Sequence, residues 1–303
     1  MSDQTRPSPA CAPSDGPVRA VVEPSPRDLG GFSVRRVLPA PQQRSVGPFI
    51  FFDEMGPATF AAGAGIDVRP HPHIGLATLT YLFEGEIMHR DSLGVVQAIR
   101  PGAVNWMTAG RGIVHSERTG PEERGRESRL HGIQSWIALP REHEEDEPAF
   151  FHHPAAALPV LDRQGVRMRL IAGEAYGQRA PVATLSGMFY LDVELDAGAR
   201  LLLPTEFPER AVYVVTGGVA IGNLAYAGGR MLIFDGGRDV EMVAQGETRL
   251  ILLGGEPLDG PRHLWWNLVS SRPERVEQAK ADWRAGRFDS VPGDPEFIPL
   301  PED

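Results

Sequence analysis

The sequence of 303 residues has a single cysteine, Cys11, and no apolar run of the roughly 18 to 20 residues needed to span a bilayer. One cysteine cannot form an intramolecular disulfide, and it is most simply explained by a cytoplasmic location. The N-terminal stretch MSDQTRPSPACAPSDGP is polar and rich in proline, and it lacks the apolar segment of a secretory signal. We therefore expect a soluble, cytoplasmic protein with no membrane contact.

Basic residues are also in short supply, because 30 Lys and Arg stand against 40 Asp and Glu. The formal net charge of −10 and the pI of about 5.4 exclude the electrostatic footprint of a direct nucleic-acid partner or of an anionic membrane surface. Protein partners and small molecules remain compatible with this charge. The length and the 42% hydrophobic content suit one large domain or two ordinary ones.

The abundant residues that break regular structure, 34 Gly and 28 Pro, separate short runs rich in Val, Ile, Leu, Phe and Tyr. Such punctuation is typical of closely spaced strands, so the chain is predicted to be mainly β. Tyr81–Gly85 is echoed by Tyr213–Gly217, and each stretch is followed by a turn and another apolar run. The order of elements favours a duplicated barrel, although two unrelated hairpins could share this short pattern by chance.

Two further segments carry local signals. The connection REHEEDEPAFFHHP, residues 141–154, is strongly charged, and we expect its acidic run to be a solvated face. In residues 270–286, Ser271 with Glu274 three residues later predicts a capping box at the start of a helix. Gly286 marks the end of that helix, and Trp283 is expected to dock it on the rest of the protein.

The most specific chemical pattern is RPHPHIGLATLTY, in which His71 and His73 flank one proline. Side chains two residues apart on a strand leave the same face, so both imidazoles should point the same way. A second pair, His115 and Glu117, has the same spacing within TAGRGIVHSER, where glycines permit tight backbone bends. The alternative is that each pair is accidental, because His-x-Glu is common and His-Pro-His can lie on a surface.

On neighbouring barrel strands, the two pairs would aim three imidazole nitrogens and one carboxylate at a single point. Such a mixed nitrogen and oxygen set leaves room for water, substrate or dioxygen, as in non-haem iron enzymes. It differs from the closed sulfur shell of a structural zinc site. His and carboxylate ligands accept Fe, Mn, Ni, Cu and Zn alike, so the sequence leaves the metal open.

The motifs RPHPHIGLATLTYLFEGEIMHRDSLG, PGAVNWMTAGRGIVHSER and LHGIQSWIALP strongly resemble the pirin family of the cupin superfamily, as does the ending WWNLVSSRPERVEQAKADW. The resemblance implies an all-β fold of two cupin barrels, which are jelly rolls or double-stranded β-helices, with a short C-terminal helix. We expect a disordered tail over 1–20, a metal-binding barrel over 21–150, a metal-free barrel over 151–260, and a helix and tail over 261–303.

The same resemblance implies that His71, His73, His115 and Glu117 bind the metal, with Fe(II) as the expected ion. It implies a mononuclear dioxygenase of the quercetin 2,3-dioxygenase type, whose substrates are a flavonol-like aromatic and dioxygen and whose catalytic proton acceptor is Glu117. The alternative is a non-catalytic, iron-dependent redox sensor that binds transcription factors or metabolic enzymes. A cavity large enough for a flavonol would favour the enzyme, and a sealed site would favour the sensor.

The remaining candidates have weaker signals. In the second half, the positions matching the His pair are Leu203 and Thr205, so no ligand pair is present there. His89 is expected to make a hydrogen bond within its hairpin. Gln134 could face the cavity or be a core amide, and His131 has no clear role. Four apolar residues and one arginine are candidates for the cavity wall or for an anion contact, although core packing and an exposed loop explain them equally well: Leu79, Phe83, Trp106, Met107 and Arg111.

Overall fold

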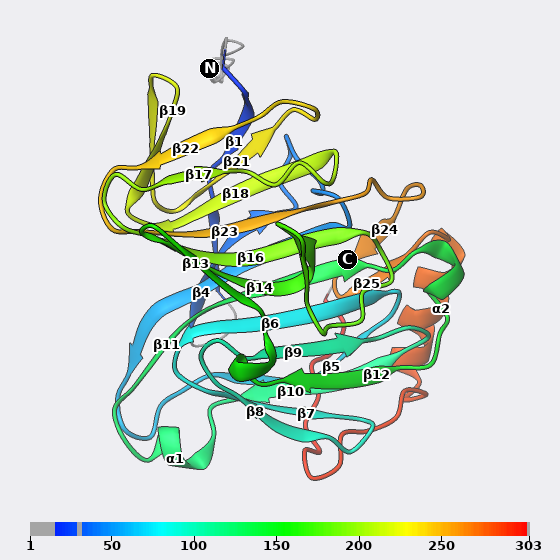
Figure 1. Cartoon of the computed structure of the whole chain (residues 1–303). Coiled ribbons are helices and arrows are strands. Elements are labelled where there is room, and N and C mark those ends of the chain that lie inside the picture. The colour runs from blue at the N-terminus through cyan, green and yellow to red at the C-terminus, as the bar shows by residue number, and fades with distance from the viewer. Residues whose placement is uncertain (1–15, 29–31, 302–303) are drawn as a thin grey trace, which may run out of the picture.

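The computed structural model describes residues 16–28 and 32–301, which form two β-barrels and one longer helix. Four sheets account for nearly all strands, two in each barrel (Figure 1). The all-β prediction is confirmed. None of the helices in these ranges is both long and apolar enough to cross a membrane.

The first barrel pairs a seven-stranded sheet with a four-stranded one. The larger sheet has the order β12 (Ala149–His153), β9 (Val104–Thr108), β6 (Leu76–Glu84), β11 (Ser128–Ala138), β4 (Phe49–Phe60), β3 (Ser33–Leu38) and β2 (Ser25–Asp28). The smaller sheet has the order β5 (Asp67–His73), β10 (Ile113–Arg118), β7 (Ile87–Asp91) and β8 (Val96–Ile99).

The second barrel repeats this arrangement with an eight-stranded and a four-stranded sheet. Its larger sheet runs β1 (Val18–Val22), β21 (Arg230–Phe234), β18 (Glu209–Thr216), β23 (Thr248–Gly255), β16 (Met188–Leu195), β14 (Val166–Ala175) and β13 (Val160–Arg163), with β15 (Gln178–Arg179) beside β14. Its smaller sheet runs β17 (Arg200–Leu202), β22 (Glu241–Ala244), β19 (Gly218–Ile221) and β20 (Leu224–Ala227).

Short elements complete the chain. They are the helix α1 (Pro121–Arg124), the single turns η1 (Arg141–His143) and η2 (Ala155–Ala157), the hairpin of β24 (His263–Trp265) and β25 (Leu268–Ser270), and the helix α2 (Pro273–Arg284).

Strands at the ends of the predicted segments cross the expected boundaries. Strand β1 precedes the first barrel in sequence but pairs with β21 of the second, so Val18 lies opposite Phe234 (Figure 1). Residues 18–20 of the predicted tail therefore form a strand, while residues 1–15 lie outside the described residues. The predicted boundary at residue 150 falls inside β12, which pairs with β9. The sequence ranges predicted for the tail and the two barrels therefore do not match the strand pairing at β1 and β12.

The two larger sheets pack face to face and bury a shared core. In β6, Ala77, Leu79 and Tyr81 point toward the second barrel, while Thr78, Thr80 and Leu82 alternate toward the interior of the first. Because both faces of this strand are covered, it is apolar and buried over most of its length. This packing fixes the strands whose inner faces form the site.

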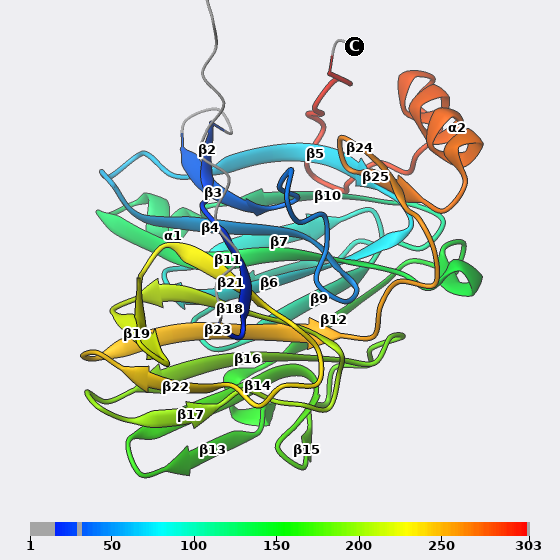
Figure 2. The same cartoon turned by 90° about the horizontal axis from the view of Figure 1, so that it is seen from above.

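The C-terminal segment, residues 259–301, returns to the first barrel and lies along β5 (Figure 2). Leu268 forms a bridge with Ile74, and Ile298 N donates to Pro70 O at 2.8 Å. Strand β5 is an edge strand of its sheet, so these contacts cover backbone groups that would otherwise be unpaired. Gly75 is required here, because a side chain at φ +67 would meet Val269 O at 2.1 Å.

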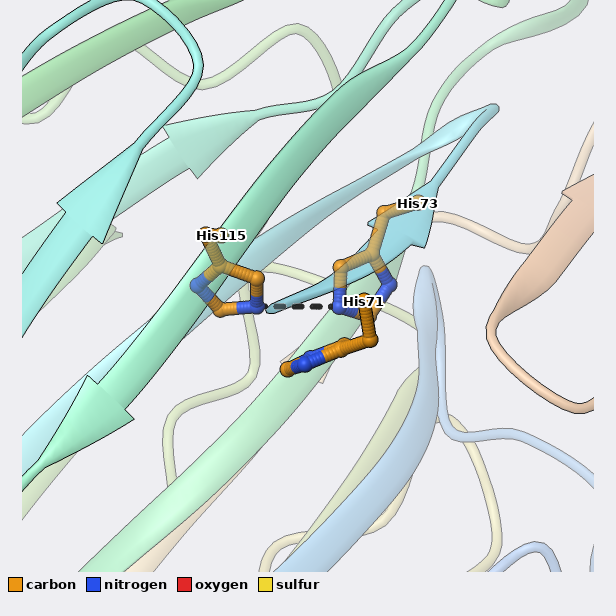
Figure 3. Close-up of side chains that lie close together, drawn as sticks. All are labelled: His71, His73 and His115. Carbon is orange, nitrogen blue, oxygen red and sulfur yellow. Dashed lines mark hydrogen bonds between the residues drawn. The ribbon is translucent and has the colours of Figure 1, made fainter. Parts of the chain in front are cut away.

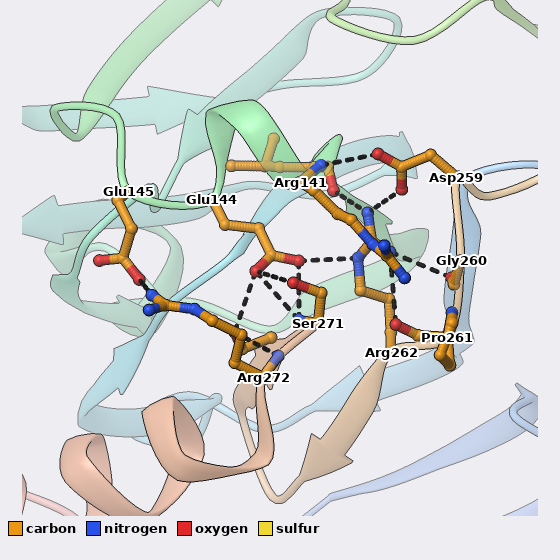
Figure 4. A network of polar contacts seen from close by, with 11 residues as sticks. Arg141, Glu144, Glu145, Asp259, Gly260, Pro261, Arg262, Ser271 and Arg272 are labelled. Atoms are coloured by element: carbon orange, nitrogen blue, oxygen red, sulfur yellow. Dashed lines mark hydrogen bonds and ion pairs between the residues drawn. The ribbon is translucent and has the colours of Figure 1, made fainter.

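The predicted capping box at Ser271 is wrong. Helix α2 begins after Arg272, and the Ser271 N–H and hydroxyl both donate to the Glu144 carboxylate. The acidic run is exposed at Glu142, Glu145, Asp146 and Glu147, as expected of a solvated face. Glu144 is the exception, since it is 3% exposed and pairs with Arg262 (Figure 4). Ser271 and Glu144 bind each other across 127 residues of sequence, so neither role could be inferred from its local pattern. Trp283 does dock α2, through Nε1 donating to Ile298 O at 2.9 Å.

Candidate metal centre

Three histidines from two neighbouring strands converge inside the first barrel. Strands β5 and β10 are antiparallel, and their register places His115 directly opposite His71, with His73 two residues along on the same face of β5. The spacing in the sequence therefore produces the convergence that it predicted for the imidazoles. Gly110, at φ +51, makes the turn that leads into β10, and a side chain there would meet Asp146 O at 2.0 Å.

The nitrogen atoms of the three rings lie close enough to share one ion. One ring nitrogen from each of His71, His73 and His115 lies within 4.8 Å of the others, and the side chains are almost fully buried (Figure 3). The closest approach is 3.1 Å between His73 Nε2 and His115 Nε2. Such a group of imidazoles suits a divalent transition metal.

Burial keeps these rings in the neutral form that binds metals. It lowers the pKa of His71 to about 4, and it lowers the pKa values of His73 and His115 well below their usual range. The mutual repulsion of the imidazolium forms adds to this effect at His73 and His115. At neutral pH, all three rings therefore offer a lone pair.

Hydrogen bonds decide which nitrogen carries that lone pair. The Nδ1 atoms of His71 and His73 lie 2.9 Å from Arg69 O and 3.1 Å from Asn267 O, and a carbonyl oxygen can only accept. Nδ1 therefore carries the proton, and Nε2 is left free for a metal. The same atoms give the site a fixed ring orientation.

His115 is held by a longer chain of side chains. Its Nδ1 lies 3.4 Å from His89 Nδ1, and His89 Nε2 lies 2.9 Å from Asp91 Oδ2. If His89 donates to the carboxylate, its Nδ1 accepts from His115 Nδ1–H, which again frees His115 Nε2. The expected hydrogen bond of His89 within its hairpin is present, and it has the further effect of orienting a ring of the triad.

Glu117 lies beside the triad but outside its tight group. It is partly buried, this burial raises the pKa of its carboxyl group, and Thr80 Oγ1 lies 3.3 Å from its Oε1. The register between β10 and β5 shifts between His115 and Glu117, so the carboxylate does not simply continue the row of imidazoles. Thr80 Oγ1 also lies 2.8 Å from Gln134 Oε1, which links Glu117 to the cavity wall.

A cavity of about 560 Å³ reaches the triad from the surface. His71, His73 and Glu117 lie in its wall together with Gln134, which settles that Gln134 faces the cavity. Further wall residues come from the C-terminal segment and from aromatic side chains of β4 and β11: Leu264, Trp266, Asn267, Ile298, Phe51 and Trp136. The Phe51 and Trp136 rings stack at 3.9 Å, and Trp136 meets His73 edge-on.

The weaker candidates fall elsewhere. Leu79, Trp106 and Met107 belong to the packed cores. Phe83 packs against the shared core, Arg111 pairs with Glu147 at 2.6 Å, and His131 pairs with Glu54 at 2.8 Å.

Asn267 was not predicted as a cavity residue, because no local pattern brings the C-terminal segment to the site. Phe51 of β4 was not predicted either, because its apolar strand carries no signal for the cavity. Trp136 could have been predicted, since it lies two residues after Gln134 and therefore on the same face of β11.

Comparisons with known proteins agree with this architecture. The family model of Pirin matches residues 31–137, and that of the Pirin C-terminal cupin domain matches residues 190–289. A pirin-like protein of Caulobacter vibrioides is 52% identical over 281 residues, which cover 91% of this chain and 96% of that protein. Pirin of Rattus norvegicus is 33% identical, with 84% and 87% of the two chains covered.

Among solved structures, a quercetin 2,3-dioxygenase of Acinetobacter baumannii superposes with a TM-score of 0.87 at 33% identity. The superposition covers 94% of this chain and 95% of that chain.

Proposed function

Because this chain belongs to the pirin family of two-barrel cupin proteins, we propose that it is a mononuclear metal-dependent dioxygenase of the quercetin 2,3-dioxygenase type. The observation that carries the proposal is the buried triad of His71, His73 and His115 at the inner end of an open cavity. We assign Fe(II) as the working ion and Glu117 as its fourth ligand. A cytoplasmic location fits the single cysteine.

The residues of the site fit such an ion without rearrangement of their protons. The imidazoles are neutral, and the acceptors on their Nδ1 atoms direct Nε2 inward. A metal bound there would coordinate and acidify a substrate hydroxyl and provide the site at which dioxygen reacts. The protein supplies the position of the aromatic rings that line the cavity on the way to the triad.

Glu117 is the proposed proton acceptor. Its raised pKa brings the carboxyl group closer to neutral pH, where a general base is most effective. The Thr80 hydroxyl, 3.3 Å away, can share its proton between Glu117 and Gln134. A carboxylate that holds the flavonol 3-hydroxyl proton would leave an electron-rich ring for attack by dioxygen, with the heterocycle opened and carbon monoxide released.

The dimensions of the cavity support catalysis over redox sensing. Pockets for small molecules commonly have volumes of about 300–1,000 Å³ and apolar walls with a few polar groups. The cavity here has about 560 Å³, and aromatic rings line it on the way to the triad. A sensor would need no such opening, so a small aromatic substrate with dioxygen explains the site better than a protein partner alone.

Oxygen uptake with quercetin tests the proposal. The protein would be loaded anaerobically with Fe(II), its iron content measured, and quercetin added in air-saturated buffer. We expect uptake with carbon monoxide release in the native protein, and a loss of at least about 100-fold in His73→Ala. A fully loaded native protein that consumes no oxygen would contradict the assignment as a flavonol dioxygenase.

A further inference from the structure

The wall of the cavity holds three cationic side chains, Arg27, Arg36 and Arg69, in a chain whose net charge is −10. They balance the three acidic residues of the wall, so the cavity is less negative than the protein as a whole. Arg27 and Arg69 are largely exposed and come from β2 and β5, so they approach the opening from two different strands. Because the rest of the protein is acidic, the groups near these arginines determine how far their charge is balanced.

Of the three acidic residues in the same wall, Glu117 lies beside the triad, and the other two are already paired with arginines. Asp53 binds Arg36 in bidentate fashion, with Nε–Oδ1 at 2.9 Å and Nη2–Oδ2 at 2.8 Å. Asp67 lies 2.7 Å from Arg124 and 3.3 Å from Arg118. Among the described residues, neither the Arg27 nor the Arg69 side chain makes a hydrogen bond or a close ion pair, although Arg27 lies near enough to Asp53 to lower the pKa of that carboxyl group. Asp53 is already bound by Arg36, so two exposed guanidinium groups at the mouth keep hydrogen-bond donors that a ligand can use.

The wall between the arginines and the triad is aromatic. The Arg36 guanidinium lies 4.4 Å above the Phe51 ring, Phe51 stacks on Trp136, and Trp136 contacts His73. This row leads from the mouth to the inner end of the cavity. A flat aromatic ligand that packs along it, with one hydroxyl at the triad, would place its far end beside the arginines.

We propose that the preferred substrate is a planar hydroxylated aromatic that carries an anionic group, such as a carboxylate or sulfonate, at the end remote from the triad. The inference rests on the proposed function and adds the substrate class. Arg27 and Arg69 recognise the anionic group through their exposed guanidinium groups, while the hydroxylated ring occupies the inner cavity. Charge complementarity of this kind selects among ligands of equal shape.

A matched pair of ligands tests the inference. The protein would be loaded with Zn(II), which does not change oxidation state, and titrated with quercetin and with quercetin-5′-sulfonate while tryptophan fluorescence is followed. We expect the sulfonate to bind about three- to tenfold tighter at low ionic strength, with the advantage shrinking at about 0.5 M salt.

The double variant Arg27→Gln/Arg69→Gln should bring the ratio of the two dissociation constants close to one. Arg163→Gln, which removes an exposed arginine of β13 in the second barrel, should leave the ratio as in the native protein. Equal affinities in the native protein, or an unchanged ratio in the double variant, would overturn the inference. If neither ligand binds to the metal-loaded protein, the proposed function itself fails.

Discussion

At the scale of single residues, the chain from Asp91 through His89 to His115 links the proposed metal ligand to a buried carboxylate. The Asp91 side chain is fixed in turn, since its Oδ1 accepts from Leu93 N at 2.9 Å and Val95 N at 3.1 Å. Groups that hold a metal-binding imidazole in one tautomer commonly change metal affinity by about 10- to 100-fold when removed. His89 should therefore act on the metal without touching it.

Replacing His89 by phenylalanine tests this role. The exchange keeps a ring beside Phe150, on which His89 stacks at 4.4 Å, but removes both nitrogens. We expect the dissociation constant for Co(II) or Zn(II), measured by titration, to rise about 10- to 100-fold. His131→Phe is the matched control, because His131 forms a comparable pair with Glu54 away from the triad. Equal affinities in His89→Phe and the native protein would contradict the account.

The titration of the triad gives a prediction for pH. His71 has a pKa of about 4 in the folded protein against 6.5 in the unfolded chain, so the unfolded chain binds more protons between these values. The metal-free protein should therefore lose stability as the pH falls from 6.5 to 4, by about 3 kcal/mol from His71 alone. Glu117, whose pKa is raised, acts in the opposite direction. Urea denaturation at several pH values checks this, with His71→Phe showing the flatter profile.

The spacing of two histidines and of a His-Glu pair was enough to predict the convergence of the imidazoles, because strand geometry sets it locally. The acceptor on His73 could not be predicted, because Asn267 is 194 residues away in sequence. The capping role assigned to Ser271 failed for a similar reason, since a buried carboxylate from a distant loop took its donors.

At the scale of elements, the C-terminal segment behaves as part of the first barrel. It covers the edge of β5, supplies Asn267 O to His73, and lines the cavity with Trp266 and Ile298. Glu144 holds the start of this segment, because its carboxylate accepts from Ser270 and Ser271 and pairs with Arg262 (Figure 4). The contacts of Glu144 therefore help to hold Asn267 where its carbonyl oxygen accepts from His73.

Removing the charge of Glu144 should be costly. Arg262 is 3% exposed, so Glu144→Gln leaves a buried cation with one partner fewer, and we expect a loss of about 3 kcal/mol in the free energy of unfolding. Glu142→Gln, two residues away in the same acidic run but 81% exposed, should change it by less than about 0.5 kcal/mol. Chemical denaturation measures both. Equal stabilities of the two variants would show that the network does not hold the segment.

At the scale of the whole molecule, the barrels are joined by a pair of symmetric contacts. Tyr81 donates to Asp192 at 2.7 Å, and Tyr213 donates to Glu54. Within the first sheet, Ile133 of β11 pairs with Tyr81 on one side and with Glu54 on the other, and within the second sheet Ile251 of β23 pairs in the same way with Tyr213 and Asp192. Each barrel thus presents a tyrosine and an acid at equivalent positions.

The similarity between the stretches that begin at Tyr81 and Tyr213 correctly predicted two related barrels. The acidic partners of the two tyrosines could not be identified, because the two adjacent acids Asp53 and Glu54 face opposite sides of β4 and bind different arginines. The strand exchange by β1 was also beyond local reasoning, since nothing in its five residues distinguishes one barrel from the other.

Tyr213→Phe tests the interface between the barrels. The exchange leaves the buried Glu54 carboxylate without one donor, and we expect a loss of about 1–3 kcal/mol in the free energy of unfolding. Tyr226→Phe, in β20 and partly exposed, is the control and should be nearly neutral. If the two variants unfold at the same urea concentration, the tyrosine contact does not stabilise the pairing of the barrels.

The most direct test of the account is the metal content of His115→Ala measured beside that of the native protein and of His131→Ala. All three would be loaded with Fe(II) anaerobically, freed of excess ion and analysed for iron per chain, with circular dichroism to check the fold. We expect close to one iron per chain in the native protein and in His131→Ala, and a nearly complete loss in folded His115→Ala. Unchanged iron in His115→Ala would contradict the assignment of the metal centre to this triad.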